Sequence, residues 1–397
     1  MVNENSRDET QDNSLTTGLV ASEPSKNGQG NRRKRHPVTA SVAVASLMTG
    51  LIFGVAIDRA QLNVPFVIVK QLDMQNFTML RMFLSASATS AVVITATNML
   101  GLYKRVPKPI TRCGFSYGGN VLGGLLLGIG MAISGACPGT VFAQIGGDPG
   151  LRTGLISLGG IMGTICFGYA EKKLRARNED FLSKSQDPNT GHESLLNSLA
   201  VAAVATMAGI IYVVDRLRPW QGEMNQVIQG GVENVNPWLV WDPLLAGIVV
   251  GACQIPSILS SGGSFGMSSG WVIPSYFFAS LIDSNVDENA PYLKKYVYSI
   301  FANWQLLTAI GAIIGSYISS TLFPTPTLSS QALQFQRSAG LSDFIGGFLL
   351  LVGARIGGGC TSGHGLSGIG LISTSSVVSV ASMFLGGMAT RALLTLM

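Results

Sequence analysis

The sequence has little charge, and long parts of it have none. Asp, Glu, Lys and Arg make up 12% of the 397 residues, whereas soluble domains carry roughly 25%. The stretches without any of these residues are 37–57, 82–103, 113–147, 153–170, 194–214, 243–282, 296–336 and 356–390. Because a bilayer crossing needs about 20 apolar residues, this pattern excludes a soluble globular domain and predicts an all-α polytopic membrane protein.

Cysteine and histidine are also scarce, with five and three residues. The number of cysteines is odd and no Cys-x-x-Cys pair occurs, which argues against a disulfide framework and a structural zinc site. We therefore expect no metal or other cofactor. Cys113, Cys166 and Cys253 lie in or beside apolar segments, and we interpret them as small buried hydrophobic residues.

The net charge of +5 comes from short basic clusters that flank apolar runs, at 32–35, 104–112 and 172–177. Because Lys and Arg collect in cytoplasmic loops, the clusters indicate topology and not nucleic-acid binding. The first cluster can also contact anionic membrane lipid. The pattern places the N-terminus and the loops at 103–112 and 171–190 in the cytoplasm of a multi-pass protein of the cell membrane.

The chain divides into four parts. Residues 1–37 are polar and poor in large apolar side chains, which predicts a disordered tail. No short apolar segment with a cleavage site opens the chain, so we expect an uncleaved first helix. A first repeat half at 38–190, a linking helix and loop at 191–239, and a second repeat half at 240–397 follow.

The apolar runs predict about nine spanning helices and about four short broken or re-entrant pieces. The spanning helices are expected at 39–57, 78–99, 116–134, 151–170, 198–214, 240–256, 296–320, 341–356 and 374–395. The short pieces are expected at 60–75, 137–148, 256–275 and 360–372. Polar residues at 283–294 predict an exposed loop.

Two glycine-rich cysteine motifs occupy corresponding places in the two halves. One is Gly135-Ala136-Cys137-Pro138-Gly139-Thr140, and the other runs from Gly358-Gly359-Cys360 to Gly365. The apolar stretches before them align without a gap, pairing Gly123 with Gly346, Gly130 with Gly353, and Cys137 with Cys360. Four crossings in each half and one linking helix give the halves opposite orientations, so we expect an inverted-topology repeat.

Each motif is expected to start a half-helix. Pro138 suits the first turn of a helix, and Thr361 and Ser362 are good caps. A helix N-terminus presents unpaired N–H groups and partial positive charge, which together bind anions. A thiol is a weak donor and acceptor, so two opposed half-helices that each carry a cysteine predict a site for a soft, sulfur-bearing anion. The candidate binding residues are Cys137, Cys360, Gly135, Pro138, Gly139, Thr140, Gly359, Thr361, Ser362, Gly363, His364 and Arg355.

Two of these candidates have alternative roles. Arg355 could attract an anion into a vestibule, or it could pair structurally or extend its charge to the interface. His364 could hold its loop by hydrogen bonds, or it could serve substrate or proton. Cys360 and His364 alone are too few ligands for zinc.

Residues 357–368, Gly-Gly-Gly-Cys-Thr-Ser-Gly-His-Gly-Leu-Ser-Gly, resemble the signature of the YeeE/YedE-type sulfur-transport family, and 135–140 resembles its companion motif. The resemblance covers roughly 40–397. It implies inverted repeats, nine spanning helices with short broken ones, and a central thiosulfate path with cysteines, on which Cys137 and Cys360 contact the substrate. The chain departs from the family at 58–65, where many members carry a further cysteine, and has Cys253 and several serines in the corresponding stretch of the second half.

The leading hypothesis is a permease for thiosulfate or a related small sulfur-containing anion, and not an enzyme. No ATP-binding loop is present, so we expect a gradient or intracellular consumption of the substrate to drive uptake. An intracellular sulfur-accepting protein is a conceivable partner. The alternatives are a membrane-embedded sulfurtransferase or thiol redox enzyme that forms a cysteine persulfide, and a passive channel for another small solute.

Overall fold

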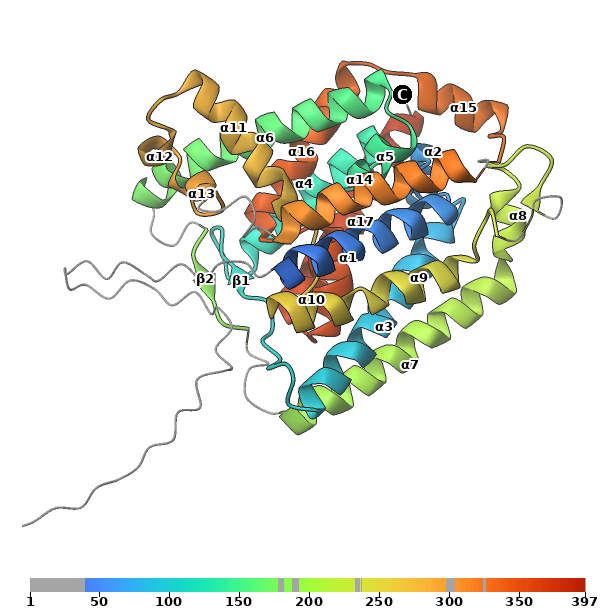
Figure 1. The fold of residues 1–397 in the computed structure, drawn as a ribbon, viewed down its shortest axis with the longest axis horizontal. Coiled ribbons are helices and arrows are strands. Elements are labelled where there is room, and N and C mark those ends of the chain that lie inside the picture. Colours follow the sequence, from blue (N-terminus) through green and yellow to red (C-terminus); the bar gives the residue numbers. More distant parts are fainter. Residues whose placement is uncertain are drawn as a thin grey trace, which may run out of the picture.

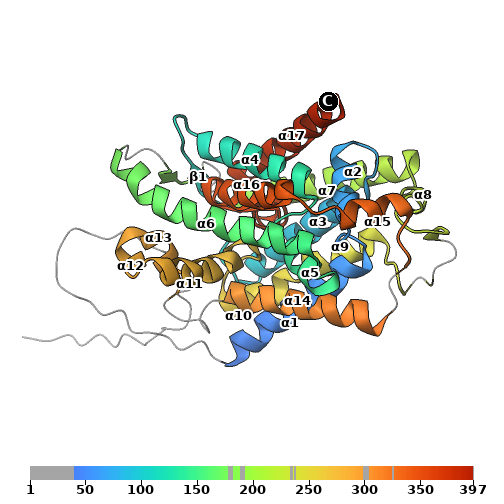
Figure 2. The same cartoon turned by 90° about the horizontal axis from the view of Figure 1, so that it is seen from above.

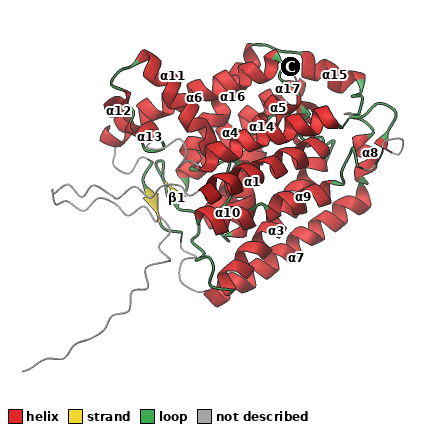
Figure 3. Ribbon diagram, viewed as in Figure 1, coloured by secondary structure: helices red, strands yellow, loops and turns green. Residues whose placement is uncertain are grey.

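The computed structural model describes residues 40–177, 182–187, 193–232, 236, 238–297, 304–323 and 326–396. The predicted tail at 1–37 lies outside these residues. Helices dominate the described chain, and one short ribbon pairs β1 (Ile110–Thr111) with β2 (Lys184–Ser185) in antiparallel register (Figures 1 and 3). The ribbon was not predicted, because strands of two residues leave no pattern in the sequence.

The helices follow one another in three groups. The first group is α1 (Ala40–Arg59), α2 (Pro65–Leu72), α3 (Thr78–Met99), α4 (Gly118–Ser134), α5 (Thr140–Gly147) and α6 (Leu151–Arg177). The middle group is α7 (Glu193–Leu217) and α8 (Trp220–Met224). The last group is α9 (Pro243–Ala252), α10 (Gln254–Ser261), the 3-10 turn η2 (Ser268–Trp271), α11 (Val272–Ile282), α12 (Val286–Asn289), α13 (Pro291–Lys294), α14 (Trp304–Leu322), α15 (Ser330–Arg337), α16 (Leu341–Gly357), the π-helical η4 (Thr361–Gly368) and α17 (Thr374–Leu396).

Seven helical segments of the described chain are long and apolar enough to cross a membrane. They are α1, α3, α6, α7, α9 with α10, α14 and α17. The pair α15 and α16 is an eighth candidate with a bend of 81° between its helices, and α4 is apolar with 17 residues. An all-helical multi-pass membrane protein is therefore confirmed, while the count of about nine spanning helices remains a prediction.

All four predicted short pieces contain short helical segments: α2, α5 and η4 lie in three of them, and η2 with most of α10 lies in the fourth. The boundary expected at residue 256 is wrong, because the helix continues through Pro256 to Ser261 as α10. Pro256 lies in the first turn of α10, where a missing N–H breaks no hydrogen bond within the helix. The next regular elements, η2 and α11, begin at Ser268 and Val272.

The segment at 283–294 is not simply an exposed loop. It contains α12 and α13, and Val286, Ala290 and Leu293 are buried in a small apolar cluster with residues of α11. Tyr169 of α6 packs against the same cluster and donates a hydrogen bond to Asp283 at 2.7 Å. The polar residues that led to the loop prediction lie between these apolar anchors, and the segment packs beside α6 at one end of the bundle (Figures 1 and 2).

The long helices of the bundle pack against one another in pairs. In the described chain α1 packs on α14, α3 packs on α9, and α4 and α16 pack on each other. In addition α17 packs on α4, α6 packs on α16, and α7 lies at the edge against α3 (Figures 1 and 2). Glycines let these backbones approach closely: a Cβ on Gly54 would collide with the carbonyl oxygen of Ala312, and one on Gly353 would lie 2.6 Å from that of Gly123.

Candidate functional site

The two cysteine motifs begin where α4 and α16 end. Both helices stop at a left-handed glycine, Gly135 with φ 60° and Gly358 with φ 80°. A residue in this conformation is the usual C-terminal cap of a helix, and glycine adopts it without a Cβ penalty. The two glycines that align in the sequence therefore make the same structural break after α4 and after α16.

Cys137 lies between this break and α5. Its backbone N–H donates to Thr140 Oγ1 at 2.8 Å, and the Thr140 N–H donates to the cysteine sulfur at 3.3 Å. The sulfur thus accepts one of the N–H groups that a helix leaves unpaired at its N-terminus. The helix itself begins at Thr140 with Gly139 as its N-cap. Pro138 consequently precedes the first turn, which corrects its predicted position inside that turn.

The loop that carries Cys137 is held by a residue of the other half. The indole N–H of Trp271 donates to the Pro138 carbonyl oxygen at 2.9 Å, and the Trp271 ring stacks on Phe142 of α5 with ring centroids 4.4 Å apart. The Gln144 side chain donates to the Gly135 carbonyl oxygen at 3.3 Å. These contacts fix the position of the Cys137 thiol relative to η2.

Cys360 is fully buried just before η4. Its sulfur lies 3.1 Å from Ser362 Oγ, and that hydroxyl accepts the Met267 backbone N–H at 3.2 Å. The prediction that Thr361 and Ser362 cap the helix is wrong, because the N-cap position is Cys360 and η4 has no side-chain cap. Instead, Ser362 joins the Cys360 thiol to the chain between α10 and η2. The π-helical geometry of η4 is rare and occurs often at functional sites.

His364 connects the second motif to the two helices that flank it. One ring nitrogen, Nε2, lies 3.1 Å from the Gly357 carbonyl oxygen at the end of α16, and the other, Nδ1, lies 3.0 Å from Ser376 Oγ in α17. The Gly359 backbone lies close against the ring, since a Cβ there would be 2.8 Å from it. Both ring nitrogens are thus used for holding the loop, as one of the two predicted roles requires.

A narrow cavity of about 40 Å³ lies between the two motifs. Its wall includes Cys137, Gly139 and Thr140 of the first motif and Thr361 and Ser362 of the second. Cys360 does not line this inter-motif cavity, and Gly363 and His364 do not either. The remaining wall is apolar and includes side chains of α1, α2 and α3. A space of this size holds only a few waters, so a solute can pass only if these walls move apart.

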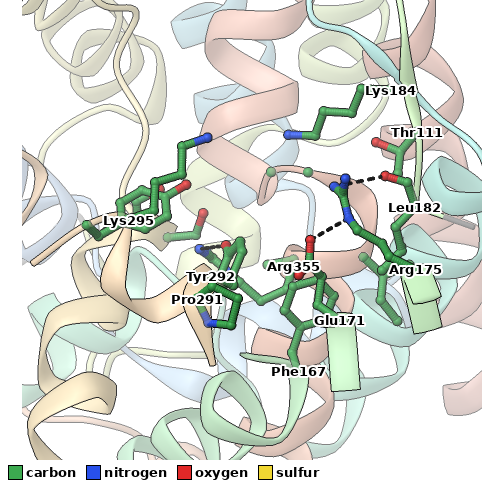
Figure 4. A pocket seen from close by; sticks show the side chains of 17 residues that line it. Thr111, Phe167, Glu171, Arg175, Leu182, Lys184, Pro291, Tyr292, Lys295 and Arg355 are labelled. Atoms are coloured by element: carbon green, nitrogen blue, oxygen red, sulfur yellow. Dashed lines mark hydrogen bonds and ion pairs between the residues drawn. The ribbon is translucent and has the colours of Figure 1, made fainter. Parts of the chain in front are cut away.

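A second and larger cavity of about 340 Å³ is lined by the residues just before Cys360, whereas Thr361 and Ser362, just after it, line the inter-motif cavity. Its wall includes Gly358, Gly359 and Arg355, and also Ser268 of η2. It carries four cationic side chains, Arg175, Lys184, Lys295 and Arg355, and one carboxylate, Glu171, which forms an ion pair with Arg175 (Figure 4). We refer to this space as the basic cavity.

A place in a vestibule is one of the two roles that the sequence allows for Arg355, but the sequence does not place Arg175, Lys184 or Lys295 there. Arg175 and its neighbours were read as topology determinants. The β1–β2 ribbon brings Lys184 beside the start of α4, and α13 brings Lys295 to the same cavity. Because these residues are far apart in the sequence, no local pattern indicates that they line the same cavity.

The other cysteines line neither of the two cavities. Cys253 is buried with its sulfur 3.5 Å from the Val249 carbonyl oxygen, and it lines neither cavity. The interpretation of Cys166 as buried is wrong, because it lies on the exposed face of α6. Exposed and buried positions of an apolar helix look alike in a membrane protein, because lipid accepts the same side chains as the core.

Long apolar helices, with short helices after two glycine–cysteine breaks, define a multi-pass membrane protein. The chain belongs to the sulphur transport family, whose sequence profile matches residues 59–389. This confirms the family resemblance carried by the cysteine motifs, and family membership makes the chain a membrane transporter.

Known proteins resemble the chain over most of its length. It is 22% identical over 357 residues to the thiosulfate transporter TsuA of Spirochaeta thermophila, covering 86% of this chain and 95% of that protein. It is 21% identical over 357 residues to the thiosulfate transporter TsuA of Escherichia coli, covering 87% and 93%. A probable transporter of Xylella fastidiosa is 27% identical over 153 residues, or 38% of this chain and 91% of that protein.

Proposed function

We propose that this chain is a permease that takes up thiosulfate or a related small sulfur-containing anion through a central path between the two cysteine motifs. The observation that carries the proposal is the placement of Cys137, which lies at the N-terminal end of α5 and faces Thr361 and Ser362 across the inter-motif cavity. Two similar relatives bear the name thiosulfate transporter. No covalent bond to the substrate is required.

The chemistry of the cavity favours a soft anion over a hard one. The N-terminal end of α5 and the start of η4 carry partial positive charge, which favours an anion. The thiol adds a polarizable and weakly polar partner. An anion with a terminal sulfur can therefore lose water to this site at less cost than phosphate, which needs strong charged donors.

Helix packing supports an inverted repeat. Gly50 and Gly54 of α1 lie against α14, and Gly247 and Gly251 of α9 lie against α3. These glycine pairs correspond in the sequence. In the same way, Gly123 of α4 approaches Gly353 of α16, and Gly130 approaches Gly346. Such an exchange of partners is what a pseudo-two-fold axis in the membrane plane produces.

The two cavities divide the proposed path into segments. In the proposed orientation the basic cavity faces the cytoplasm, because it is lined by the segment at 171–190 that the positive-inside rule places there. Cys360 lies between the basic cavity and the inter-motif cavity. The substrate passes from Cys137 to Cys360 when the apolar wall of the inter-motif cavity opens, and it leaves through the basic cavity.

Uptake of radiolabelled thiosulfate by cells that lack their own carrier tests this function. Cells with the wild-type chain should accumulate label, and Cys137→Ser and Cys360→Ser should each lower the initial rate by about tenfold, which corresponds to roughly 1.4 kcal/mol. Cys166→Ser is the matched control, because it removes an exposed thiol that lines neither cavity, and it should transport at the wild-type rate. A correctly inserted wild-type chain without uptake would refute the proposal.

The same cells separate a permease from an enzyme. A permease leaves Cys137 and Cys360 unmodified during uptake, so mass spectrometry of the chain recovered from transporting cells should find both as free thiols. A persulfide on either residue that appears with thiosulfate and disappears with the sulfur acceptor would establish the sulfurtransferase hypothesis instead.

A further inference from the structure

The basic cavity contains an excess of positive charge without a partner on its wall. Glu171 is the one carboxylate among its lining residues, and it is paired with Arg175. Lys184, Lys295 and Arg355 thus have no carboxylate on the wall. Figure 4 shows the side chains of Lys184 and Lys295 reaching toward each other across the cavity. Like charges that converge in this way are stable only with strong hydration or with an anion between them.

Arg355 is the strongest sign of an absent ligand. Its side chain is 93% buried at the end of α16, since its relative exposure is 7%. Nη1 donates to the Tyr292 hydroxyl at 3.1 Å. Within the part of the chain that the structure describes, Nε and Nη2 are buried and have no hydrogen-bond partner. A buried charged donor without an acceptor is costly, and the cavity beside it is where an acceptor can enter.

A purely structural role for Arg355 does not account for this geometry. A basic residue in the last turn of a helix often bonds the terminal carbonyl oxygens. In the described structure Arg355 makes its side-chain bond to Tyr292 of α13 instead, while the Gly357 carbonyl oxygen accepts from Asn120 at 3.3 Å and lies 3.1 Å from His364 Nε2. The guanidinium is therefore held by its Tyr292 contact and leaves two nitrogens unused.

The pKa of Lys184 reflects the positive charges around the basic cavity. Lys184 is an exposed residue, but the protein around its ammonium displaces water and lowers the pKa below the ordinary value. The nearby charges of Lys295, Arg175, Lys108 and Arg355 lower this pKa further. An anion in the cavity would oppose this repulsion. The cavity, at about 340 Å³, is many times the roughly 30 Å³ that one water occupies in the liquid. It has room for a small anion with part of its hydration shell.

We propose that the basic cavity is a second anion site, separate from the thiols, that binds the oxygen-bearing end of a small divalent oxoanion through Arg355, Lys184 and Lys295. Its place on the substrate path rests on the proposed function, whereas its ability to bind an oxoanion does not. The thiols contact the soft sulfur end of the substrate, and the cationic side chains of the basic cavity bind its oxygens. Sulfate has the same oxygens, so sulfate on this face competes with departing thiosulfate.

Calorimetric titration of the full chain in lipid nanodiscs tests the site, with sodium sulfate as the probe and sodium chloride of matched ionic strength as the control titrant. Sulfate should bind the wild type. Lys184→Gln and Lys295→Gln should each weaken binding roughly three- to tenfold, and neither exposed lysine is needed for packing. Lys294→Gln is the matched control, because Lys294 pairs with Asp287 and does not line the cavity; it should bind as the wild type does.

A Cys137→Ser, Cys360→Ser double variant separates this site from the thiol site. It should keep wild-type affinity for sulfate and bind thiosulfate with similar affinity, because the basic cavity binds the oxygens that both anions carry. The proposal is overturned if wild type does not bind sulfate, if the two lysine variants bind it unchanged, if chloride replaces it at equal ionic strength, or if the double variant binds sulfate but not thiosulfate. Loss of cellular thiosulfate uptake with sulfate binding intact would contradict the transport function and leave the site standing.

Discussion

At the scale of single residues, the site depends on side chains that hold other groups in place. His364 bonds both the end of α16 and α17, and Ser362 bonds the Cys360 thiol. The sequence predicted the two cysteines and a hydrogen-bonding role for His364, because these residues stand in a polar motif within apolar surroundings. It could not predict that Lys184 and Lys295 line the basic cavity. The residues next to a lysine in the sequence do not show whether it lines a cavity or only marks a cytoplasmic loop.

His364→Ala should destabilise the protein by about 2 to 4 kcal/mol, because it removes the His364 contacts with the buried Ser376 hydroxyl and the Gly357 carbonyl oxygen and opens a cavity. It should also lower thiosulfate uptake, since the Cys360 loop loses its attachment to α16. The thermal unfolding midpoint of purified protein measures the first effect, with Cys166→Ser as the control. Wild-type stability in His364→Ala would show that these two contacts do not hold the loop.

At the scale of helices, glycine determines how closely the backbones approach. Gly54 and Gly251 occupy corresponding sequence positions, and a Cβ at either would collide with a backbone of the facing helix, α14 or α3. Helix positions were largely predictable from the apolar runs, and 78–99 is α3 itself. The helix end predicted near Pro256 is wrong, because proline occurs in the first turn of a helix as well as just after a helix ends.

Gly54→Val and Gly251→Val should each cost about 1 to 3 kcal/mol or more, because neither interface has room for added methyl groups. Gly209→Val in α7 is the matched control: it lies in an apolar helix with nothing within 4 Å of an added Cβ. The fraction of protein that stays monodisperse after heating in detergent measures the difference. Equal loss in all three variants would indicate a general valine effect and not close packing.

At the scale of the whole molecule, the proposed direction of transport depends on which end of the helix bundle faces the cytoplasm. The β1–β2 ribbon, which carries Lys184 of the basic cavity, lies at one end of the bundle, and α8 lies at the other (Figure 1). Charge distribution in the sequence predicts which end faces the cytoplasm. It did not predict how the chain at 283–294 folds, because three apolar residues among many polar ones give no periodic signal.

Cysteine labelling tests the orientation. In a background with Cys113→Ser and Cys166→Ser, a membrane-impermeant maleimide should label Gln229→Cys, beside α8, in intact cells. Gln186→Cys, beside β2, should react only after the membrane is permeabilised. Both side chains are exposed in the structure. The opposite result would reverse the protein in the membrane and place the basic cavity outside the cell.

The most direct test of the central claim is thiosulfate flux into liposomes that contain only the purified chain. Initial rates would be compared among wild type, Cys166→Ser and the Cys137→Ser, Cys360→Ser double variant, with equal protein inserted in each. We predict saturable uptake by wild type and Cys166→Ser, and uptake by the double variant reduced at least about tenfold, or roughly 1.4 kcal/mol. Equal flux in all three would show that the paired thiols do not recognise the substrate.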